Sequence, residues 1–109
     1  MPLKTNIVLI GMPAVGKSTV GVLLAKRAGK AFLDTDIHIQ MQDGRRLQDI
    51  LDREGIPGFC ALEERHILAI TCEAHVIATG GSVVYSEPAM AHLRAAGTVV
   101  FMDLGAEEL

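Results

Sequence analysis

Hydrophobic residues along the chain form short continuous runs that alternate with longer stretches of helical spacing. The first run, residues 7–10, is apolar at every position and ends at Gly11, which is typical of a strand buried on both faces of a sheet. Similar β-rich runs predict strands over residues 31–34, 75–79 and 98–102. Strands separated by helical stretches predict a parallel sheet covered by helices on both faces, the three-layer, doubly wound α/β class.

The first helical stretches have recognisable ends. Residues 17–28 predict a helix that stops at Gly29. The side of this helix that we expect to pack on the sheet carries Val20, Leu23, Leu24 and Ala28. Residues 37–43 and 47–53 predict two short helices, each followed closely by a glycine.

Two later helices complete the pattern. Residues 59–73 predict a long helix because side chains recur there at helical spacing, namely Phe59, Leu62, His66 and Ile70. Ser86 is predicted as the N-cap of a helix that has Pro88 in its first turn and ends at Gly97. Residues 103–109 have the pattern of one more helix opening, so the sequence is either a fragment of a longer protein or an abbreviated form of its fold.

Length and composition fit one packed domain, which we place at residues 1–109. Of these, 50% are hydrophobic and 21% charged, so the chain is globular rather than disordered. A net charge of −3 and a low aromatic content argue against a nucleic-acid partner or a charged membrane surface. Cys60 and Cys72 lack C-x-x-C spacing and are predicted to be reduced core residues. Without a membrane-spanning run or a secretory signal, we expect a cytoplasmic protein, and a monomer.

One segment carries a specific chemical signal. Residues 11–18 read Gly-Met-Pro-Ala-Val-Gly-Lys-Ser and match G-x-x-x-x-G-K-[ST], directly after a predicted strand and at the start of a predicted helix. In such a loop, glycines let successive backbone N–H groups point at an anion, and the helix adds the positive end of its dipole. A chance match in a chain of this length is on the order of one in a few hundred. The sequence therefore predicts a nucleoside-triphosphate site.

The side chains of this loop have separate predicted roles. Lys17 would place its positive charge on the β- and γ-phosphates, and Ser18 would offer its hydroxyl to Mg²⁺. ATP and Mg²⁺ are therefore the predicted cofactors. The residues predicted to contact the nucleotide are Gly11, Met12, Pro13, Ala14, Val15, Gly16, Lys17, Ser18 and Thr19.

Further segments resemble, in order, those of the shikimate kinase family of small P-loop kinases. Residues 16–25 are similar to the end of that family's phosphate loop and its first helix, and residues 32–36 to its F-x-D-x-D segment. Residues 55–63 resemble its G-E-x-x-F-R-x-x-E stretch, residues 76–81 its V-I-A-x-G-G-G strand end, and residues 97–102 its fourth strand. The resemblance implies a P-loop NTPase fold of the nucleoside-monophosphate-kinase-like type, with strand order 2-3-1-4-5 and kinase activity.

Two acids after the second predicted strand fit this chemistry. In an extended segment, residues two apart face the same way, so Asp34 and Asp36 can both face the carboxyl end of the sheet, where open α/β sheets bind ligands. The resemblance implies that Asp34 orders water on Mg²⁺ and that Asp36 binds the acceptor hydroxyl and acts as its base. Together with Lys17 these are the predicted catalytic residues. Alternatively, Asp36 is the N-cap of a helix that begins at residue 37, and both roles are compatible.

The resemblance also implies an acceptor site formed by Asp36, Phe59, Gly80, Gly81 and Ser82. Gly80 and Gly81 either bend the chain at the end of a strand or let the backbone approach the acceptor closely. Asp103 follows the fourth predicted strand and could be a metal-binding acid of the Walker B type, but we expect it to begin the next helix.

The sequence departs from the family pattern on the acceptor side. Cys60 stands where the family has an arginine that would clamp the shikimate carboxylate, and a neutral thiol cannot replace a guanidinium. Glu63, one helical turn further on, loses the partner it would have in that arginine. Ser82 stands where the family has a third glycine. The family's lid, last strand, adenine-binding segment and a further acceptor-binding arginine follow its fourth strand and have no counterpart in these residues.

Other candidate residues carry little signal. The four histidines lie in different predicted elements, so zinc binding is not expected. Arg45 and Arg46 follow a glycine and are predicted to be solvated in a turn. Arg65 lies about 140° around the predicted helix from Cys60 and is therefore poorly placed to replace the missing arginine.

These patterns lead to three hypotheses. The first is a shikimate kinase-like enzyme that transfers a phosphoryl group from ATP to a hydroxyl of a small polyhydroxylated acid. The second is the same chemistry on a different small hydroxy compound, because of Cys60 and Ser82. The third is a truncated nucleotide-binding module without catalysis, because a lid is missing. Retention of both Asp34 and Asp36 argues against the third.

Overall fold

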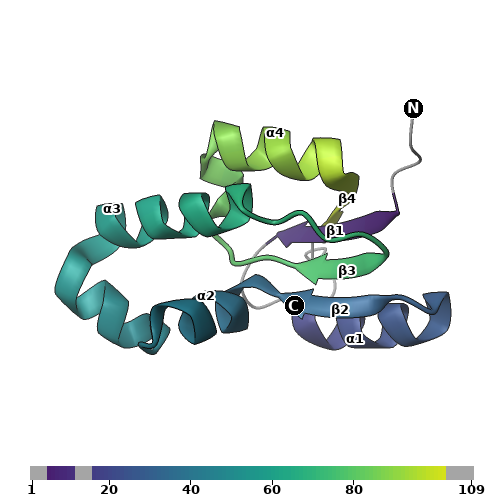
Figure 1. Ribbon diagram of the computed structural model, residues 1–109, viewed down its shortest axis with the longest axis horizontal. Helices are drawn as coiled ribbons and strands as arrows, with labels where there is room; N and C mark the ends of the chain where they lie inside the picture. The colour runs from purple at the N-terminus through teal and green to yellow at the C-terminus, as the bar shows by residue number, and fades with distance from the viewer. Residues whose placement is uncertain (1–4, 12–15, 103–109) are drawn as a thin grey trace, which may run out of the picture.

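The computed structural model describes residues 5–11 and 16–102, which alternate between strands and helices as the sequence predicts (Figure 1). The strands are β1 (Asn6–Gly11), β2 (Ala31–Asp34), β3 (His75–Ala78) and β4 (Gly97–Met102). They form one parallel sheet in the order β2-β3-β1-β4. This confirms the predicted α/β class and the first four positions of the strand order implied by the resemblance.

The helical elements are α1 (Lys17–Ala28), α2 (Thr35–Asp43), α3 (Leu47–Leu68), the short 3-10 helix η2 (Val83–Tyr85) and α4 (Glu87–Ala96). Figure 1 shows α1 on one side of the sheet and α4 on the other, which gives the predicted three layers. In the same view, α2 and the first part of α3 extend beyond the carboxyl ends of the strands.

The core is divided by the sheet. On the side of α3 and α4, buried residues from β1, β3 and the helices pack together, namely Val8, Ile10, Ile67, Ile70, Ile77, Val83, Ala89 and Leu93. On the side of α1 the cluster is smaller and consists of Leu9, Ala25 and Val76. A third cluster, made of Ile39, Ile50 and Leu62, joins α2 to α3. The continuous apolar run of β1 is thus buried on both faces, as predicted.

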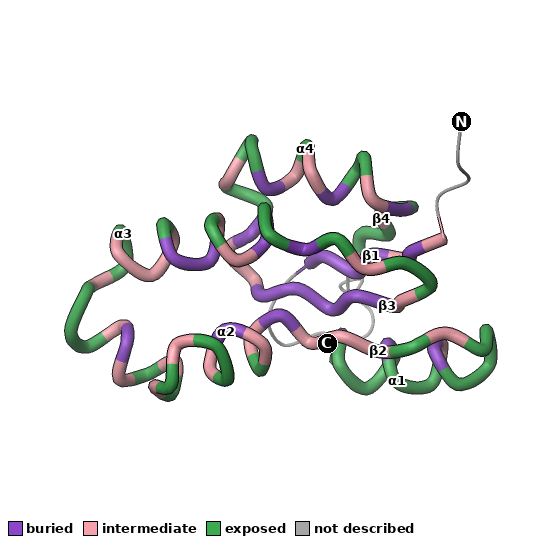
Figure 2. The backbone as a smooth tube through the Cα atoms, viewed as in Figure 1, coloured by how far each residue is buried: buried purple, intermediate pink, exposed green. Residues whose placement is uncertain are grey.

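The buried side of α1 differs from the prediction. Val20 and Leu23 are 41% and 59% exposed, whereas Gly21 and Ala25 are buried against the sheet. A Cβ on Gly21 would lie 2.5 Å from Cε1 of Phe32, so the missing side chain lets the Phe32 ring pack against the helix. Figure 2 shows that most of α1 is exposed. The prediction is confirmed for Leu24, which packs against the cluster of Leu9, Ala25 and Val76. It is wrong for Val20, Leu23 and Ala28, which are exposed because the close contact with the sheet is made by Gly21.

Helix α3 contains both of the helices predicted for residues 47–53 and 59–73, and the second of them ends earlier than predicted. It is two helical segments that meet at Gly55, whose backbone has φ 71° and ψ 178°. Pro57 lies in the first turn of the second segment, where a missing N–H costs no helical hydrogen bond. The helix ends at Leu68 instead of residue 73. Beyond this end, Nδ2 of Asn6, in β1, donates to the carbonyl of Cys72 at 2.8 Å.

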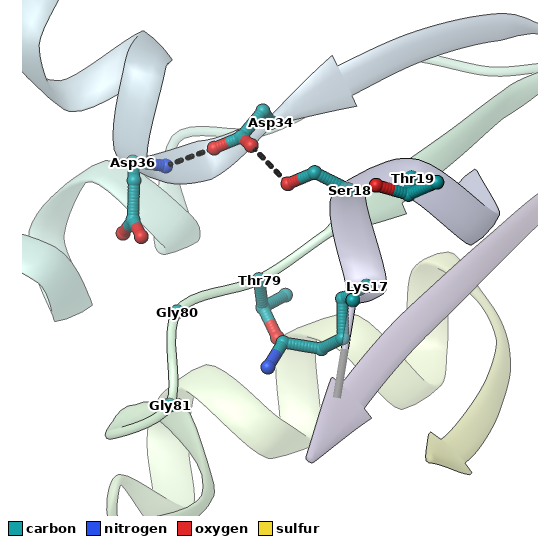
Figure 3. Close-up of a pocket in the computed structure, with 9 residues that line it drawn as sticks. Lys17, Ser18, Thr19, Asp34, Asp36, Thr79, Gly80 and Gly81 are labelled. Atoms are coloured by element: carbon teal, nitrogen blue, oxygen red, sulfur yellow. Dashed lines mark hydrogen bonds between the residues drawn. The ribbon is translucent and has the colours of Figure 1, made fainter. Parts of the chain in front are cut away.

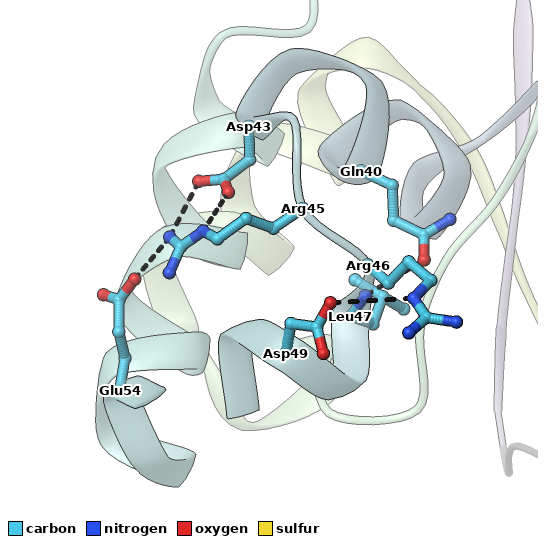
Figure 4. A network of polar contacts seen from close by, with 7 residues as sticks. All are labelled: Gln40, Asp43, Arg45, Arg46, Leu47, Asp49 and Glu54. Atoms are coloured by element: carbon cyan, nitrogen blue, oxygen red, sulfur yellow. Dashed lines mark hydrogen bonds and ion pairs between the residues drawn. The ribbon is translucent and has the colours of Figure 1, made fainter. Parts of the chain in front are cut away.

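Arg45 is not simply solvated, which corrects the sequence-based expectation. Its guanidinium forms ion pairs with Asp43 at the end of α2 and with Glu54 in α3 (Figure 4). The backbone N–H of Leu47 donates to Oε1 of Gln40 at 3.0 Å and joins the same two helices. Arg46 is exposed, as predicted, and its Nε forms an ion pair with Oδ2 of Asp49 at 3.6 Å. These contacts fix the α2–α3 turn beside the carboxyl end of the sheet.

Candidate active site

A hollow lies at the carboxyl ends of the strands, where the first turn of α1, the end of β2 and the end of β3 meet. Its lining consists of Gly16, Lys17, Ser18, Thr19, Asp34, Asp36, Thr79, Gly80 and Gly81. Figure 3 shows Lys17 and Asp36 projecting into it from opposite sides. We call it the phosphate hollow, after the loop motif that it contains.

Lys17 is the cationic side chain in the described lining. It is 6% exposed, and its Nζ donates to the carbonyl of Gly11 at 2.9 Å. Burial lowers the pKa of this ammonium, and the nearby carboxylates of Asp36 and Asp34 act in the opposite direction. Gly16, just before it, has a positive φ of 76°, the left-handed conformation that favours glycine. The loop motif therefore has a backbone reason for its second glycine.

Asp34 connects α1 to α2. Its Oδ2 accepts a hydrogen bond from the hydroxyl of Ser18 at 2.6 Å, and its Oδ1 accepts from the backbone N–H groups of Asp36 at 2.9 Å and Ile37 at 3.2 Å (Figure 3). Asp34 is thus the N-cap of α2. The alternative that Asp36 caps this helix is wrong, because α2 begins at Thr35. Asp36 lies in a helical turn rather than in an extended segment, yet it lines the same hollow as Asp34.

The Asp36 carboxyl is only partly accessible to water. Burial raises its pKa, repulsion from Asp34 raises it further, and attraction to Lys17 opposes the shift. The repulsion arises because the carboxylate of Asp34 lies only two residues away and disfavours a negative charge on Asp36. Such a group holds a proton more tightly than an ordinary aspartate and is a stronger base once ionised.

A second hollow, which we call the acceptor hollow, shares Asp36, Gly80 and Gly81 with the first. The remaining lining residues are Leu47, Phe59, Glu63, Ser82 and Tyr85. A Cβ on Gly80 would lie 2.8 Å from Oδ1 of Asp36 and 2.8 Å from Oε2 of Glu63. No side chain larger than hydrogen fits at this junction without displacing a carboxylate.

Glu63 projects from α3 into this junction and is 3% exposed. Its Oε1 accepts a hydrogen bond from the hydroxyl of Ser82 at 2.8 Å, while Oε2 has no partner among the described residues. Burial raises the pKa of the Glu63 carboxyl, the bond from Ser82 lowers it, and Asp36 raises it. The sequence departs from the family pattern at positions 60 and 82, and both departures concern Glu63. Position 60 is a cysteine rather than an arginine, and the hydroxyl at position 82 donates a hydrogen bond to Glu63.

The structure brings most of the predicted site residues together. Gly16, Lys17, Ser18, Thr19, Asp34, Asp36, Gly80 and Gly81 line the phosphate hollow, and Phe59 and Ser82 line the acceptor hollow. Gly11 contributes its carbonyl to Lys17. The predicted contacts of Met12, Pro13, Ala14 and Val15, and the helix start at Asp103, lie outside the described residues.

The sequence did not single out Thr79, Leu47 or Tyr85 as lining residues. Thr79 could have been predicted from the sequence, because it directly precedes the two glycines at the end of a buried strand. Its hydroxyl donates to the carbonyl of Leu9 at 2.9 Å. Leu47 and Tyr85 reach the acceptor hollow only through the packing of α3 and η2.

Within residues 5–11 and 16–102, no group of three or more His, Cys, Asp or Glu side chains is arranged to hold a metal ion by itself. None of the helices in this described part combines the length and the apolar character that crossing a membrane requires.

A parallel sheet of this order, with a G-x-x-x-x-G-K-S motif between β1 and α1, defines the class of P-loop nucleotide-binding proteins. A family model described as shikimate kinase matches residues 13–109. The chain therefore belongs to the shikimate kinase family.

Individual relatives agree with this assignment. The chain is 44% identical over 110 residues to shikimate kinase of Paracidovorax citrulli, with 97% of this chain and 60% of the relative covered. It is 41% identical over 103 residues to shikimate kinase 2 of Dickeya chrysanthemi, with 94% and 60% covered. The chain thus spans about 60% of the length of these curated relatives.

Solved structures give the same result. Shikimate kinase from Acinetobacter baumannii, in complex with shikimate, superimposes with a TM-score of 0.89 at 35% identity, over 95% of this chain and 59% of that one. Shikimate kinase from Aquifex aeolicus gives a TM-score of 0.84 at 35% identity, over 94% and 61%.

Proposed function

We propose that the protein transfers the γ-phosphoryl group of ATP to a hydroxyl of a small polyhydroxylated acid, and that shikimate is the first acceptor to test. One observation carries the proposal: Lys17, Ser18 and the two acids Asp34 and Asp36 surround one hollow, which continues at Gly80 into a second. This is the arrangement that a kinase needs, with a phosphate site and a hydroxyl site joined at a base. Residues 1–109 would form one domain, the nucleotide-binding core of the enzyme.

The phosphate hollow suits a magnesium–nucleotide. The Ser18 hydroxyl and the Asp34 carboxylate, 2.6 Å apart, offer hard oxygen donors, and Mg²⁺ in nucleotide sites takes one or two such protein ligands together with phosphates and water. Ser18 would bind the ion and Asp34 would orient its water. When bound, Mg²⁺ would neutralise charge on the phosphates. Lys17 would exchange the Gly11 carbonyl for phosphate oxygens, since it is already directed into the hollow.

Asp36 is the proposed base. Figure 3 shows its carboxylate turned toward Gly80, at the boundary between the two hollows, so a hydroxyl bound there would face both the base and the phosphates. A raised pKa favours this role, because a more basic carboxylate takes the hydroxyl proton more readily as the new oxygen–phosphorus bond forms. Asp36 must be ionised to act, so transfer is expected to fall as the pH drops through its raised pKa.

The acceptor is proposed to lie between Phe59 and the backbone of Gly80 and Gly81. Phe59 gives the hollow an apolar wall, and the two glycines leave room for a ring to approach the backbone. The shikimate kinase from A. baumannii binds shikimate and shares this fold. Support for shikimate as the acceptor here comes from that relative and from family membership.

A coupled assay of ADP release tests the proposal with the longest native form of the chain. Shikimate is added to enzyme, ATP and Mg²⁺, and the ATPase rate without acceptor is subtracted. Phosphorylated shikimate, identified by mass spectrometry, is the expected product. Tight ADP binding without transfer to shikimate or to other sugar acids and polyols would instead favour a non-catalytic nucleotide-binding module.

A further inference from the structure

Two kinds of side chain line the acceptor hollow. The polar ones are Asp36, Glu63 and Ser82, and those with apolar or aromatic groups are Leu47, Phe59 and Tyr85. A polyhydroxylated ring compound is divided in the same way, because its hydroxyl groups can bond polar atoms while its C–H groups form an apolar surface. Ligand sites in proteins commonly combine apolar and aromatic walls with a few polar groups of this kind.

Tyr85 differs from the other two apolar lining residues in its burial. Leu47 and Phe59 pack against the cluster that joins α2 to α3, so part of their surface already serves the fold. Tyr85 is 86% exposed, although it lines the same hollow. The fold of the described residues therefore leaves the aromatic ring of Tyr85 in contact with water, and a ligand in the hollow can bury it.

The backbone that carries Tyr85 is attached to α3 on both sides. The hydroxyl of Ser82, before η2, donates to Oε1 of Glu63 at 2.8 Å. The hydroxyl of Ser86, after η2, donates to Oε2 of Glu64 at 3.0 Å. Within this segment the N–H of Tyr85 donates to the carbonyl of Ser82 at 3.1 Å. The place of Tyr85 at the hollow is thus set before a ligand arrives, which lowers the entropic cost of a contact with it.

We propose that Tyr85 is an acceptor-binding residue. Its aromatic ring packs against the C–H surface of the bound phosphoryl acceptor, while the polar side chains of the hollow bond the acceptor's hydroxyl groups. The contact is made by the ring and not by the phenolic hydroxyl. This inference rests on the proposed function in one respect, the use of this hollow for the acceptor.

Truncation of Tyr85 tests the contact. The affinity for shikimate is measured by calorimetry on the native chain with saturating ADP and Mg²⁺. Tyr85→Ala removes the ring and is expected to weaken binding about tenfold, whereas Tyr85→Phe keeps the ring and should bind nearly as tightly as the unchanged chain. An unchanged affinity in the alanine variant would overturn the inference. A loss in Tyr85→Phe as large as that in Tyr85→Ala, or no binding of shikimate by the native chain, would overturn it as well.

Val84→Ala is the matched control. It shortens the neighbouring side chain of η2, which is 37% exposed and lies outside the described lining of the hollow. The affinity of this variant for shikimate should equal that of the unchanged chain. The affinity for ADP should be the same in all the variants, because neither position lines the phosphate hollow. An equal loss of shikimate affinity in Val84→Ala would assign the effect to η2 as a whole and overturn the role of Tyr85.

Fluorine NMR gives a readout that a purely structural role would not change. The native chain is labelled with fluorotyrosine, and the Tyr85 resonance is the one missing from the labelled Tyr85→Phe variant. Shikimate is expected to shift this resonance in the presence of ADP and Mg²⁺, because the ring passes from water to contact with the ligand. An unshifted resonance at a shikimate concentration that calorimetry shows to be saturating would overturn the inference.

Binding and phosphoryl transfer are scored separately so that the two proposals can fail independently. If shikimate binds and shifts the Tyr85 resonance but is not phosphorylated, the proposed kinase function fails and the contact with Tyr85 stands. If shikimate is phosphorylated and its KM is the same in Tyr85→Ala as in the unchanged chain, the kinase function stands and the contact fails.

Discussion

At the scale of single residues, three carboxylates line the site, and they differ in their hydrogen bonds and in their pKa values. Asp34 is committed on both oxygens, to the cap of α2 and to Ser18. Asp36 and Glu63 are instead held near each other around Gly80, with raised pKa values. The first is therefore suited to fixing geometry, and the other two to contacts with a ligand.

Replacing Asp36 with Asn should separate binding from chemistry. Asparagine keeps the shape but cannot take a proton, so the rate of phosphoryl transfer is expected to fall about 100-fold or more while ADP affinity changes little. In the unchanged protein, the rate should decline with acidification at a pH above the usual range of an aspartate, because the pKa of Asp36 is raised. Steady-state rates from pH 4.5 to 8 measure both effects. Full activity of the asparagine variant would exclude Asp36 as the base.

Replacing Glu63 with Gln should stabilise the fold at neutral pH. The pKa of Glu63 is raised in the folded state, so the folded protein binds the proton more tightly than the unfolded chain, and the stability from this group is lost as the pH rises through the raised pKa. Removing the buried charge should therefore raise the free energy of unfolding by about 1 kcal/mol at pH 7. The gain should disappear near pH 4, below the usual pKa of a glutamate. Urea titrations at the two pH values are the measurement, and an equal gain at both would contradict the electrostatic origin.

At the scale of elements, glycines decide where helices can pack and bend. Gly55 allows α3 to turn between its two segments, and Gly21 allows α1 to approach β2. The exposed apolar residues on α1, including Val22 at 50% and Leu23 at 59%, lie away from this contact. The orientation of α1 carries Lys17 and Ser18 into the phosphate hollow, so the packing of Gly21 also supports the site.

A larger side chain at position 21 should show which side of α1 faces the sheet. Gly21→Leu would force carbon atoms into the space occupied by the Phe32 ring and is expected to cost about 1–3 kcal/mol of stability. Val22→Leu, on the exposed side of the same helix, should change stability by less than about 0.5 kcal/mol. Thermal unfolding compares the two variants. A tolerated leucine at position 21 would show that α1 packs by another side.

At the scale of the whole molecule, the site lies where several elements that are distant in sequence end together. The first turn of α1, the end of β2 and the end of β3 all reach the phosphate hollow, and α3 and η2 complete the acceptor hollow. A ligand held by all of them should therefore stabilise the molecule as a unit, because it binds only when the elements are assembled.

ADP with Mg²⁺ is expected to raise the unfolding free energy by about 2.7 kcal/mol at a concentration 100 times its dissociation constant. Lys17→Met removes the charge that faces the phosphates and should abolish most of this gain at the same ADP concentration. Differential scanning calorimetry with and without ADP measures both proteins. If the methionine variant gained as much stability as the unchanged chain, Lys17 would have no part in nucleotide binding.

The sequence by itself determined the order of strands and helices, the class of fold and the location of the phosphate loop. These features depend on neighbouring residues: an apolar run such as 7–10 makes a buried strand, and the Gly16-Lys17-Ser18 segment that follows opens a helix. A pattern of this kind is readable because the residues that cause the structure lie next to one another along the chain.

Only the tertiary structure decided the contacts between distant residues. Asn6 bonds the Cys72 carbonyl beyond the end of α3, the Phe32 ring packs against Gly21 of α1, and Ser82 bonds Glu63 at the acceptor hollow. Each of these pairs is separated by at least ten positions in the sequence. Their effect depends on distance in space and on exclusion of water, which no local pattern of hydrophobic and polar residues encodes.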